Sequence, residues 1–543
     1  MTAFIKYGAM VLFILTGVVF GQVAVAATYT MTPADDWTVL ENAQAGDVVE
    51  IAPGTYDFRV HLDNVGTADN PIIIRAQDPA NRPVWDLVGD ESHLVSDAPG
   101  SYTAGDRGRG CWQVGQDGGH YEISGIVFRN CRDSASAGFR AVNSGPVKLT
   151  DCLFENNTNG LTGASEDFVV EHCEFRNNGK TFEGGNMTHN IYVFGGRFTM
   201  RYCYNHDSHE GQLFHIRAAH SVIEYNWLAR PSSYVGDIMS CEYLCDGAAQ
   251  HMTLTGNVIV QGTPENESQL IALYADEDTG VAEMNIKLYY NTIIGTPRSS
   301  GQTHNLLNLR NDSIDTHATL ENNIIYNVGS IAELANVNMT NWSVVGQNNW
   351  VTAGTDVTYI SNSIEGSVSP FTDVANLDFT LSENSTAVGA AESAPAEMPV
   401  REYFLNEETI CAYRERQTAD DLGAFEFGTA GNGIDAYGAT PITPPDVDTG
   451  NIDTDFTDTS DSDAIDDTES ETEYGDTSIE DTSVTADTEA SAGDTGSGDD
   501  DDDDSNGGDG EATVGSDSAG CGCIISGTAQ SQSVFALLMH MLF

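Results

Sequence analysis

The chain has 543 residues and a formal net charge of −60, from 82 acidic and 22 basic side chains. Residues 443–520 contain 27 of the acidic side chains and no Lys or Arg, so 55 acidic and 22 basic residues remain elsewhere. Nucleic acids and anionic membranes are bound through cationic side chains that release counterions. The acidic balance therefore excludes both as partners.

The first 26 residues predict a cleaved export signal. Lys6 precedes an apolar run from Met10 to Phe20, and the small residues at 24–26 form a signal peptidase pattern. Neither this run nor any later stretch before residue 520 approaches the ~20 apolar residues of a membrane span. We expect an exported protein with a soluble body, either secreted or held at the cell surface.

The body, residues 27–430, contains an internal repeat that predicts a right-handed parallel β-helix. Several repeats follow an alternating apolar stretch, such as Val147 and Leu149, which is typical of a half-buried strand. Their spacing of 21 to 34 residues suits coils with variable loops, whereas leucine-rich repeats need a regular Leu pattern and a steadier period. The aligned central positions are Ile126, Cys152, Cys173, Cys203, Asn226, Asn257, Asn291, Asn323 and Asn348.

The aligned column predicts ladders of stacked side chains inside the solenoid. The same position recurs on successive coils about 4.8 Å apart, so the Asn run can hydrogen-bond to itself and to turn backbone. The Cys run is expected to be buried free thiols, because its Cβ atoms lie farther apart than the ~3.8 Å of a disulfide. The disulfide candidates are Cys241 with Cys245 and Cys111 with Cys131.

Both ends of the body resemble a known family. The stretches APGTY at 52–56 and NVGTADNPI at 64–72 resemble the opening coils of pectin-lyase-like β-helix proteins, including the chondroitinase B and alginate lyase group. The stretch DLGAFE at 421–426 is similar to the DxGAxE close of many secreted bacterial β-helix proteins. The resemblance implies an exported, carbohydrate-directed solenoid.

A second resemblance lies in the middle of the body. HNIY at 189–192 and GQLFHIRA at 211–218 resemble the motif pair HNIY and GHxxKSRA of one branch of these proteins. His215 stands where that branch tends to carry Lys, and Gln212 where it carries His. If the Lys is the base of the branch, either an imidazole replaces it here or the activity differs.

The same region is the one locally basic part of an acidic body. The segments that follow it are expected on successive coils of one sheet, so that Tyr192, His215, Asp237, Tyr274 and Arg310 project into one groove. The basic residues between 189 and 220 are His189, His206, His209, His215, His220, Arg197, Arg201 and Arg217.

This arrangement suits β-elimination on a uronate-containing, anionic polysaccharide. The reaction needs a cation at the C5 carboxylate, a base for the C5 proton and an acid for the leaving oxygen. Arg217, with Arg310, is the predicted cation, and Tyr192 the predicted acid. His215 or His189 is the predicted base, because imidazole titrates near neutrality. The expected substrate contacts are Arg197, His209, Tyr274 and Arg310.

A calcium ion is an alternative to the arginines. Carboxylates near the groove offer the oxygen ligands that calcium prefers, although their spacing matches no recognised calcium loop. The candidate donors are Asp237, Glu242, Asp276, Glu277 and Asp278.

Other functions remain open at this stage. Histidines on a solenoid surface are often solvated, and a surface Arg often pairs with a carboxylate. A glycoside hydrolase needs two acids flanking the bond, and Asp312 has no obvious acidic partner; an epimerase is a further possibility. A non-catalytic, adhesive glycan-binding protein would carry exposed aromatic or Thr ladders along many coils, whereas the unusual residues here are concentrated between 189 and 242.

The chain ends in two further segments. Residues 431–519 are rich in Asp, Thr, Ser and Gly, with too few apolar groups to offset chain entropy, and predict a disordered linker. Residues 520–543 combine Cys521, Cys523 and a short apolar end, which resembles C-terminal sorting signals for surface attachment. The closing Arg cluster of those signals is missing. We expect a monomer.

Overall fold

The computed structural model describes residues 26–87, 110–132, 137–179, 188–245, 247, 249–262, 269–275, 281–298, 301–310, 314–334, 340–392, 398–404, 411–429 and 432–438. These residues all fall within one compact unit of the chain. The export signal up to residue 25, the predicted linker of residues 431–519 except residues 432–438, and the sorting segment lie outside the described residues, as do Asp276, Glu277, Asp278 and Asp312. Those predictions stay predictions.

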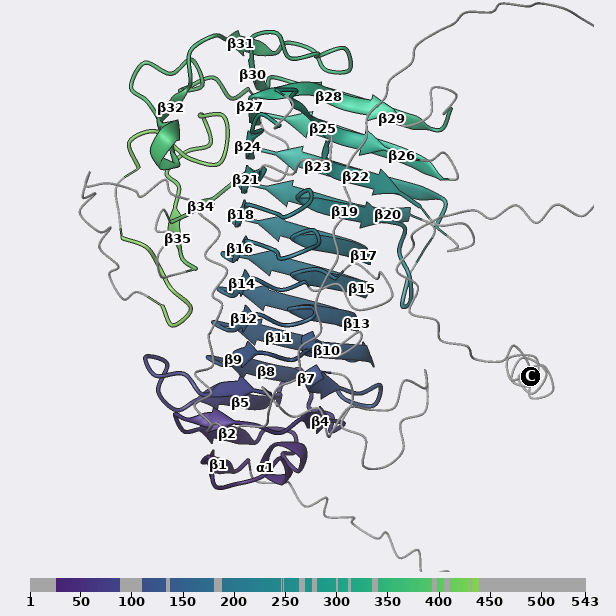
Figure 1. The fold of residues 1–543 in the computed structure, drawn as a ribbon, viewed down its shortest axis with the longest axis vertical. Helices are drawn as coiled ribbons and strands as arrows, with labels where there is room; N and C mark the ends of the chain where they lie inside the picture. The colour runs from purple at the N-terminus through teal and green to yellow at the C-terminus, as the bar shows by residue number, and fades with distance from the viewer. Residues whose placement is uncertain are drawn as a thin grey trace, which may run out of the picture. The chain divides into compact units, whose positions relative to one another are not determined.

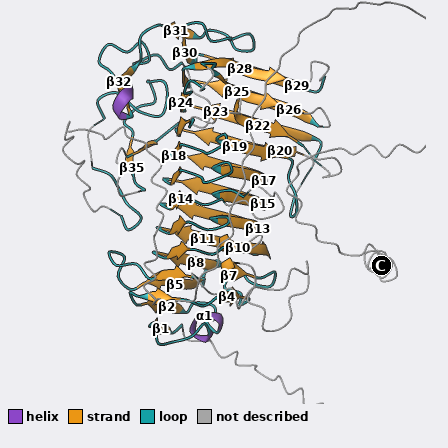
Figure 2. Ribbon diagram, in the orientation of Figure 1, coloured by secondary structure: helices purple, strands orange, loops and turns teal. Residues whose placement is uncertain are grey.

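The described residues form a right-handed parallel β-helix, as predicted. Short strands stack coil on coil along the solenoid (Figure 1), and strands dominate the described chain (Figure 2). Three parallel ladders make up each coil. The first two ladders are joined in one sheet because β13 (Leu161–Glu171), β15 (Ile191–Arg201) and β17 (Phe214–Glu224) are long enough to run through both.

The first ladder contains the N-terminal halves of these long strands. Its other members are β4 (Val60–Leu62), β7 (Gly110–Val114), β10 (Ala137–Ser144), β19 (Gly236–Met239), β22 (Gln269–Tyr274), β25 (His304–Leu309) and β28 (Val328–Leu334).

The second ladder contains the C-terminal halves of the long strands. Its other members are β1 (Thr28–Met31), β2 (Val48–Ile51), β5 (Ile72–Ala76), β8 (Tyr121–Ser124), β11 (Val147–Thr150), β20 (Ala249–Thr255), β23 (Glu283–Tyr289), β26 (Asp315–Glu321) and β29 (Trp342–Gln347).

The third ladder is a separate sheet of two- and three-residue strands. Its members are β3 (Thr55–Tyr56), β6 (Val84–Asp86), β9 (Val127–Arg129), β12 (Leu153–Glu155), β14 (Glu174–Arg176), β16 (Tyr204–His206), β18 (Trp227–Ala229), β21 (Val258–Val260), β24 (Thr292–Ile294), β27 (Ile324–Tyr326), β30 (Trp350–Thr352) and β31 (Ile364–Gly366).

The remaining elements lie near the ends. The helix α1 (Thr38–Glu41) follows β1, and none of the described helices is long and apolar enough to cross a membrane. The C-terminal part contains the hairpins β32 (Phe371–Asp373) with β33 (Asp378–Leu381) and β34 (Arg401–Tyr403) with β35 (Tyr413–Glu415), and the 3-10 turn η2 (Val374–Asn376).

The core is built from identical positions on successive coils. Strands such as β15 alternate buried and partly buried residues, so one side of each strand points inward. Phe128, Phe154 and Phe175 occupy the same register position of β9, β12 and β14 and stack with ring centroids 5.1 and 4.7 Å apart. Stacked rings of this kind add to the burial of apolar surface that drives folding.

The predicted asparagine ladder is present, with one correction. Asn226, Asn257, Asn291 and Asn323 each pass a side-chain hydrogen bond to the next coil, at 2.9 to 3.0 Å. The last rung is Asn349 and not Asn348, as the sequence alignment had it. The two are adjacent, and the Asn348 side chain instead donates to Asn322 and to the carbonyl of Ala390.

A second ladder was not predicted. Asn157, Asn178, Asn190 and Asn205 are buried and linked by side-chain hydrogen bonds of 2.8 to 3.1 Å. Asn190 belongs to the HNIY stretch, so this motif position is structural. The ladder fixes the backbone on either side of it, where His189 and Tyr192 lie.

The cysteine predictions are confirmed. Cys152, Cys173 and Cys203 are buried free thiols that occupy the start of the aligned column. The predicted disulfides, Cys111 with Cys131 and Cys241 with Cys245, are both formed.

The C-terminal part covers the outer face of the third ladder from β16 to β30. Trp227, Val258 and Trp350 of that ladder form one apolar cluster with Phe379 and Leu422 of the C-terminal part. The DLGAFE stretch holds this cover in place, because Gly423 donates its amide to the carbonyl of Asn322 and the Asp421 carboxylate accepts from the amides of Gly389 and Phe427. Along these strands the outer face of the third ladder is therefore buried.

Replacing Asn257 by Ala is expected to destabilise the solenoid by about 3 kcal/mol, because the amide of Asn226 and the side chain of Asn291 lose buried partners. Asn285→Ala is the control: this side chain is only half-buried and bonds to Glu283, so we expect a change within about 0.5 kcal/mol. Thermal unfolding of both variants measures the difference. Equal midpoints for Asn257→Ala and wild type would show that the ladder contributes nothing to stability.

Candidate functional site

Five consecutive strands of the first ladder bring the predicted residues together. In the registers of β15, β17, β19, β22 and β25, Tyr192 lies opposite His215, His215 opposite Asp237, and Asp237 opposite Ala272, which faces Asn308. Side chains alternate along a strand, so this column points outward while its neighbours Val193, Ile216 and Ile238 are core residues. The expected adjacency of these segments is confirmed.

His215 lies at the centre of this column. Its Nδ1 is 3.4 Å from Oδ2 of Asp237, and both side chains are buried. Oδ1 of Asp237 accepts a hydrogen bond of 2.7 Å from the hydroxyl of Tyr234. The imidazole ring also lies against Tyr192 and His189, with ring centroids 4.6 and 5.2 Å away. We call these five residues the His215 cluster.

Two imidazole nitrogens of the cluster are buried and have no hydrogen-bond partner in the described part of the chain. They are Nε2 of His215 and Nδ1 of His189. Leaving a buried polar atom unpaired costs about 1–3 kcal/mol, and such atoms in a native fold call for an explanation such as a binding or catalytic role. Asp237 faces Nδ1 of His215, so the unpaired Nε2 is the nitrogen left for a ligand.

His189 is held in its neutral form. Burial, reinforced by the neighbouring His215, lowers its pKa from 6.5 to about 3. An imidazole with so low a pKa is a weak proton acceptor at neutral pH, because an effective general base has a pKa near the working pH. Of the two predicted bases, the geometry favours His215.

Tyr234 was not predicted, and it positions Asp237. It lies three residues before Asp237 at the start of β19. Burial and the nearby Asp237 raise the pKa of Tyr234, so its hydroxyl stays protonated and donates. The only signal in the sequence was the short spacing of Tyr234 and Asp237 in the YVGD stretch, and only the structure shows the hydrogen bond between them.

Arg310 completes the far side of the same face. Its guanidinium lies 5.4 Å from the ring centroid of Tyr234 and 5.7 Å from that of Tyr274, in cation–π geometry. The side chain is partly exposed, and no carboxylate of the described residues pairs with it. Arg310 and Tyr274 thus lie next to the His215 cluster, as predicted.

Arg217 is also on this face but is already engaged. Its Nη1 forms a 2.9 Å ion pair with Glu242, and its Nε donates to the carbonyl of Ser240 at 3.2 Å. The guanidinium is buried, so a bound carboxylate would have to share it with Glu242. The arrangement suits a positioning role that ties β17 to the loop after β19.

Two predicted substrate contacts lie elsewhere. Arg197 follows the bend at Gly195 in β15, where φ is +111°, and its exposed side chain stands on the second ladder between Asp167 and His220. His209 lies in the exposed turn between β16 and β17, 3.9 Å from Glu210. The structure does not bring either residue into the His215 cluster.

Each of the two predicted metal ligands already faces a nitrogen of a neighbouring His or Arg side chain. Asp237 pairs with His215 and Glu242 with Arg217. Within the ranges that the structure describes, no group of three or more His, Cys, Asp or Glu side chains is arranged to hold a metal ion. The other carboxylates offered for calcium lie outside these ranges.

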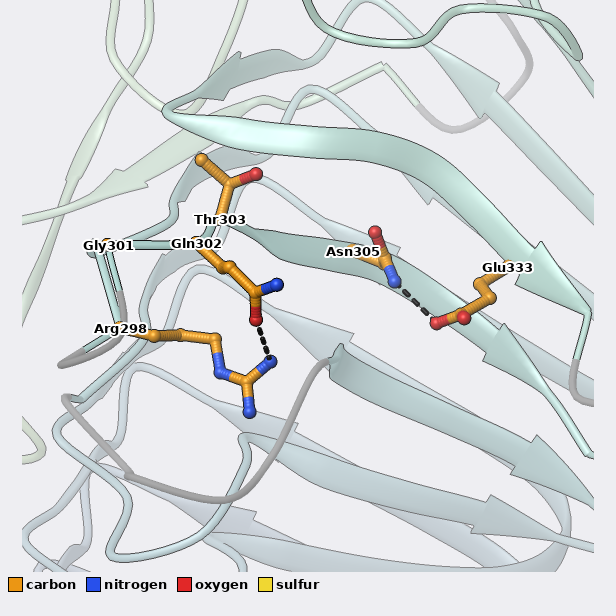
Figure 3. Close-up of a pocket in the computed structure, with 6 residues that line it drawn as sticks. All are labelled: Arg298, Gly301, Gln302, Thr303, Asn305 and Glu333. Atoms are coloured by element: carbon orange, nitrogen blue, oxygen red, sulfur yellow. Dashed lines mark hydrogen bonds between the residues drawn. The ribbon is translucent and has the colours of Figure 1, made fainter. Parts of the chain in front are cut away.

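A polar hollow of about 430 Å³ lies farther along the first ladder, at β25 and β28 (Figure 3). Arg298 donates to Gln302 at 3.4 Å and Asn305 donates to Glu333 at 2.5 Å, so each charged group is bonded to a neutral amide side chain. Glu333 is opposite Asn308 in the strand register and therefore continues the outward column of His215. The hollow extends this face without adding an acid–base pair.

The sequence matches no protein-family model and no curated protein. Solved structures with a similar fold include the pectate lyase Pel9A, at 13% identity and a TM-score of 0.46 over 75% of this chain and 98% of that chain. An alginate lyase from Paenibacillus sp. str. FPU-7 has 12% identity and a TM-score of 0.33 over 63% and 98%. A GH136 lacto-N-biosidase from Eubacterium ramulus has 10% identity and a TM-score of 0.39 over 63% and 68%. These likenesses do not decide an activity.

Acidification is expected to destabilise the wild type through His189. The unfolded chain takes up a proton on this residue below about pH 6.5, whereas the folded chain resists it down to about pH 3. Stability should fall by about 1.4 kcal/mol for each pH unit between these limits. Thermal unfolding of wild type and His189→Gln between pH 7 and 4 measures this, and the variant should lose less. Parallel losses in both proteins would contradict a buried neutral imidazole.

Proposed function

We propose that the protein is a polysaccharide lyase that cleaves a uronate-containing, anionic glycan by β-elimination at the outer face of the first ladder. The observation that carries the proposal is the pairing of His215 with Asp237, which leaves Nε2 of the imidazole without a partner among the described residues, on the face that also carries Arg310 and Tyr274. A proton acceptor oriented by a carboxylate, next to an aromatic surface and a cation, fits the chemistry of this substrate class.

His215 is the proposed base. Nε2 takes the proton from C5 of the uronate while the Asp237 carboxylate holds Nδ1 and stabilises the imidazolium that forms. Tyr234 keeps the carboxylate in place through its hydrogen bond. A His–Asp pair of this kind supplies the basicity that the Lys of the resembling motif would supply at this position.

Arg310 is the proposed partner of the substrate carboxylate. Neutralising that carboxylate makes the C5 proton more acidic and stabilises the charge that develops during its removal. Arg310 is better placed for this than Arg217, whose guanidinium is buried in its pair with Glu242. Its position near the rings of Tyr234 and Tyr274 limits the freedom of the guanidinium.

Tyr192 is the proposed acid. Its ring lies against His215, so its hydroxyl group can serve the same sugar unit. The C5–H bond and the C4–O bond break, a C4=C5 double bond forms, and the leaving oxygen takes the phenolic proton. His215 then returns a proton to solvent and Tyr192 regains one, so no water is consumed and the site is restored.

The remaining expectations follow as parts of the proposal. The protein acts outside the cell, either free or attached to the cell surface. Its body and the anionic glycan both carry net negative charge, so they repel each other at long range. Calcium is a candidate bridge between such a body and an anionic polymer. The assay below therefore includes it as a variable.

His215→Ala is expected to lower kcat by about 10²–10⁴-fold, because proton transfer in the transition state is lost. Ultraviolet absorbance of the new C4=C5 bond reports the reaction of residues 26–438 with alginate, pectate, chondroitin sulfate, hyaluronan and heparin, with and without calcium. Arg197→Ala is the matched control, since Arg197 lies on the second ladder, and it should keep its rate. Full activity of His215→Ala would refute the assignment, and binding of a polymer without turnover by wild type would favour an adhesive function.

Two replacements of Arg310 distinguish the effect of its positive charge from the effect of its side-chain volume. Arg310→Ala should raise KM and lower kcat together, by about 10²-fold in kcat/KM or more, because the carboxylate loses its cation in both the bound and the transition state. Arg310→Lys should recover part of this loss. A second measurement compares cleavage of a uronate polymer with cleavage of the same polymer after its carboxyl groups are reduced. The reduced polymer should not be cleaved by any variant. Equal kcat/KM for Arg310→Ala and wild type would remove Arg310 from the site.

A further inference from the structure

A short disulfide-closed loop lies at the edge of the proposed site. It runs from Cys241 to Cys245, directly after β19, and the disulfide joins its two ends. Glu242 inside the loop pairs with Arg217, which lies two residues beyond His215 on β17. The loop is therefore fastened to the same strands that carry the His215 cluster.

The backbone of this loop is strained. Tyr243 has φ +57° and Leu244 has φ +44°, a left-handed conformation that is unusual for side chains of this kind. Each such residue costs about 1–3 kcal/mol and persists only where the surroundings enforce it. Here the disulfide and two backbone hydrogen bonds do so: the Glu242 amide donates to the carbonyl of Arg217 at 3.1 Å, and the Glu242 carbonyl accepts from Gly195 at 3.2 Å.

The strained residues carry large side chains that are left in solvent. Tyr243 is 36% exposed and Leu244 is 39% exposed. Gly or Asn is the favoured residue at a left-handed position, because Gly has no side chain and the side chain of Asn is short and polar. Consecutive exposed apolar side chains held rigidly by a disulfide are typical of a surface that binds something.

The ring of Tyr243 is continuous with the proposed site. It lies 5.6 Å from the ring of Phe194, and Phe194 lies 4.9 Å from Tyr192, which contacts His215. These separations are within the range of aromatic pairs, 4.5–7 Å. An aromatic path of three ring contacts therefore leads from the exposed loop to the imidazole.

We propose that the loop 241–245 is a sugar-binding platform, on which the ring of Tyr243 packs against the apolar face of a pyranose unit of the glycan a short distance from the cleaved bond. The inference rests on the proposed function for the identity of the ligand, an extended uronate polymer. Tyrosine suits the task because its flat body is apolar while its hydroxyl remains hydrated. The disulfide pre-orders the ring, so little side-chain and loop entropy is lost on binding.

The platform also explains why Arg217 is paired with Glu242. The ion pair and the two backbone hydrogen bonds fix the loop relative to β17 and β15. Arg217 is then a positioning residue that acts through the loop and does not touch the substrate. This explains why Arg217 is buried and paired although it lies near the site, where Arg310 is the proposed partner of the substrate carboxylate.

The test compares Tyr243→Ala, Tyr243→Phe and the double variant Cys241→Ser with Cys245→Ser in the protein spanning residues 26–438. Binding of the same five polymers is measured by titration calorimetry, and cleavage by ultraviolet absorbance. Tyr243→Ala should weaken binding and raise KM about 10-fold with kcat changed far less, and Tyr243→Phe should restore wild-type values. The double variant should weaken binding in the same direction without unfolding, because the disulfide closes only a short loop. Tyr29→Ala, at a tyrosine of β1 that is 44% exposed, should bind as wild type does.

The outcomes separate the platform from the lyase activity. Wild type that binds a polymer without cleaving it, with Tyr243→Ala weaker, would sink the lyase proposal and support the platform. Cleavage by wild type with equal KM and affinity in Tyr243→Ala would overturn the platform and leave the lyase in place. Failure of wild type to bind any of the polymers would contradict both.

Discussion

Parallel strand pairing at a repeat of about 4.8 Å is the constraint on which the candidate site depends. Tyr192, His215 and Asp237 are each more than twenty residues apart in sequence, yet one register places them side by side on β15, β17 and β19. A slip of one residue would turn all three side chains into the core. The interior asparagine ladder from Asn226 to Asn349 holds the coils in register, because each amide bonds to its equivalent on the next coil.

The three outer faces of the solenoid have different roles. The third is covered from β16 to β30 by the C-terminal part through an apolar cluster, and the second carries alternating polar side chains with ion pairs such as that of Arg201 with Glu224. On the first, buried ionisable groups replace the apolar or solvated residues that stability would favour. Two unpaired imidazole nitrogens and two left-handed residues occur within this one region. Unpaired polar atoms and left-handed residues also occur on other described coils, for example at His304 and Asn130, so the distinctive feature of this face is the pair of His215 with Asp237.

The sequence predicted the fold because period-two patterns and a recurring strand core are local signals. It placed Asn348 in the ladder instead of Asn349, since two adjacent asparagines fit the alignment equally well. The ladder of Asn157 to Asn205 was missed because it spans few coils and has no constant offset from the strand cores.

The site was predictable only in part. Strand register follows from the repeat, so Tyr192, His215, Asp237, Tyr274 and Arg310 could be grouped. Side-chain contacts made by loops could not be predicted from the sequence. The ion pair of Arg217 with Glu242 and the hydrogen bond from Tyr234 to Asp237 are of this kind. Arg197 was misplaced because β15 bends at Gly195, so one strand serves two faces.

The central claim is that this face cleaves a uronate glycan by elimination rather than by hydrolysis. Mass analysis of products formed in water enriched in the heavy oxygen isotope tests it most directly. The account predicts unsaturated fragments without incorporated label, because the C5 proton and the leaving group depart and no water is added. Saturated fragments that carry the label would contradict it and assign a hydrolytic reaction to the same fold.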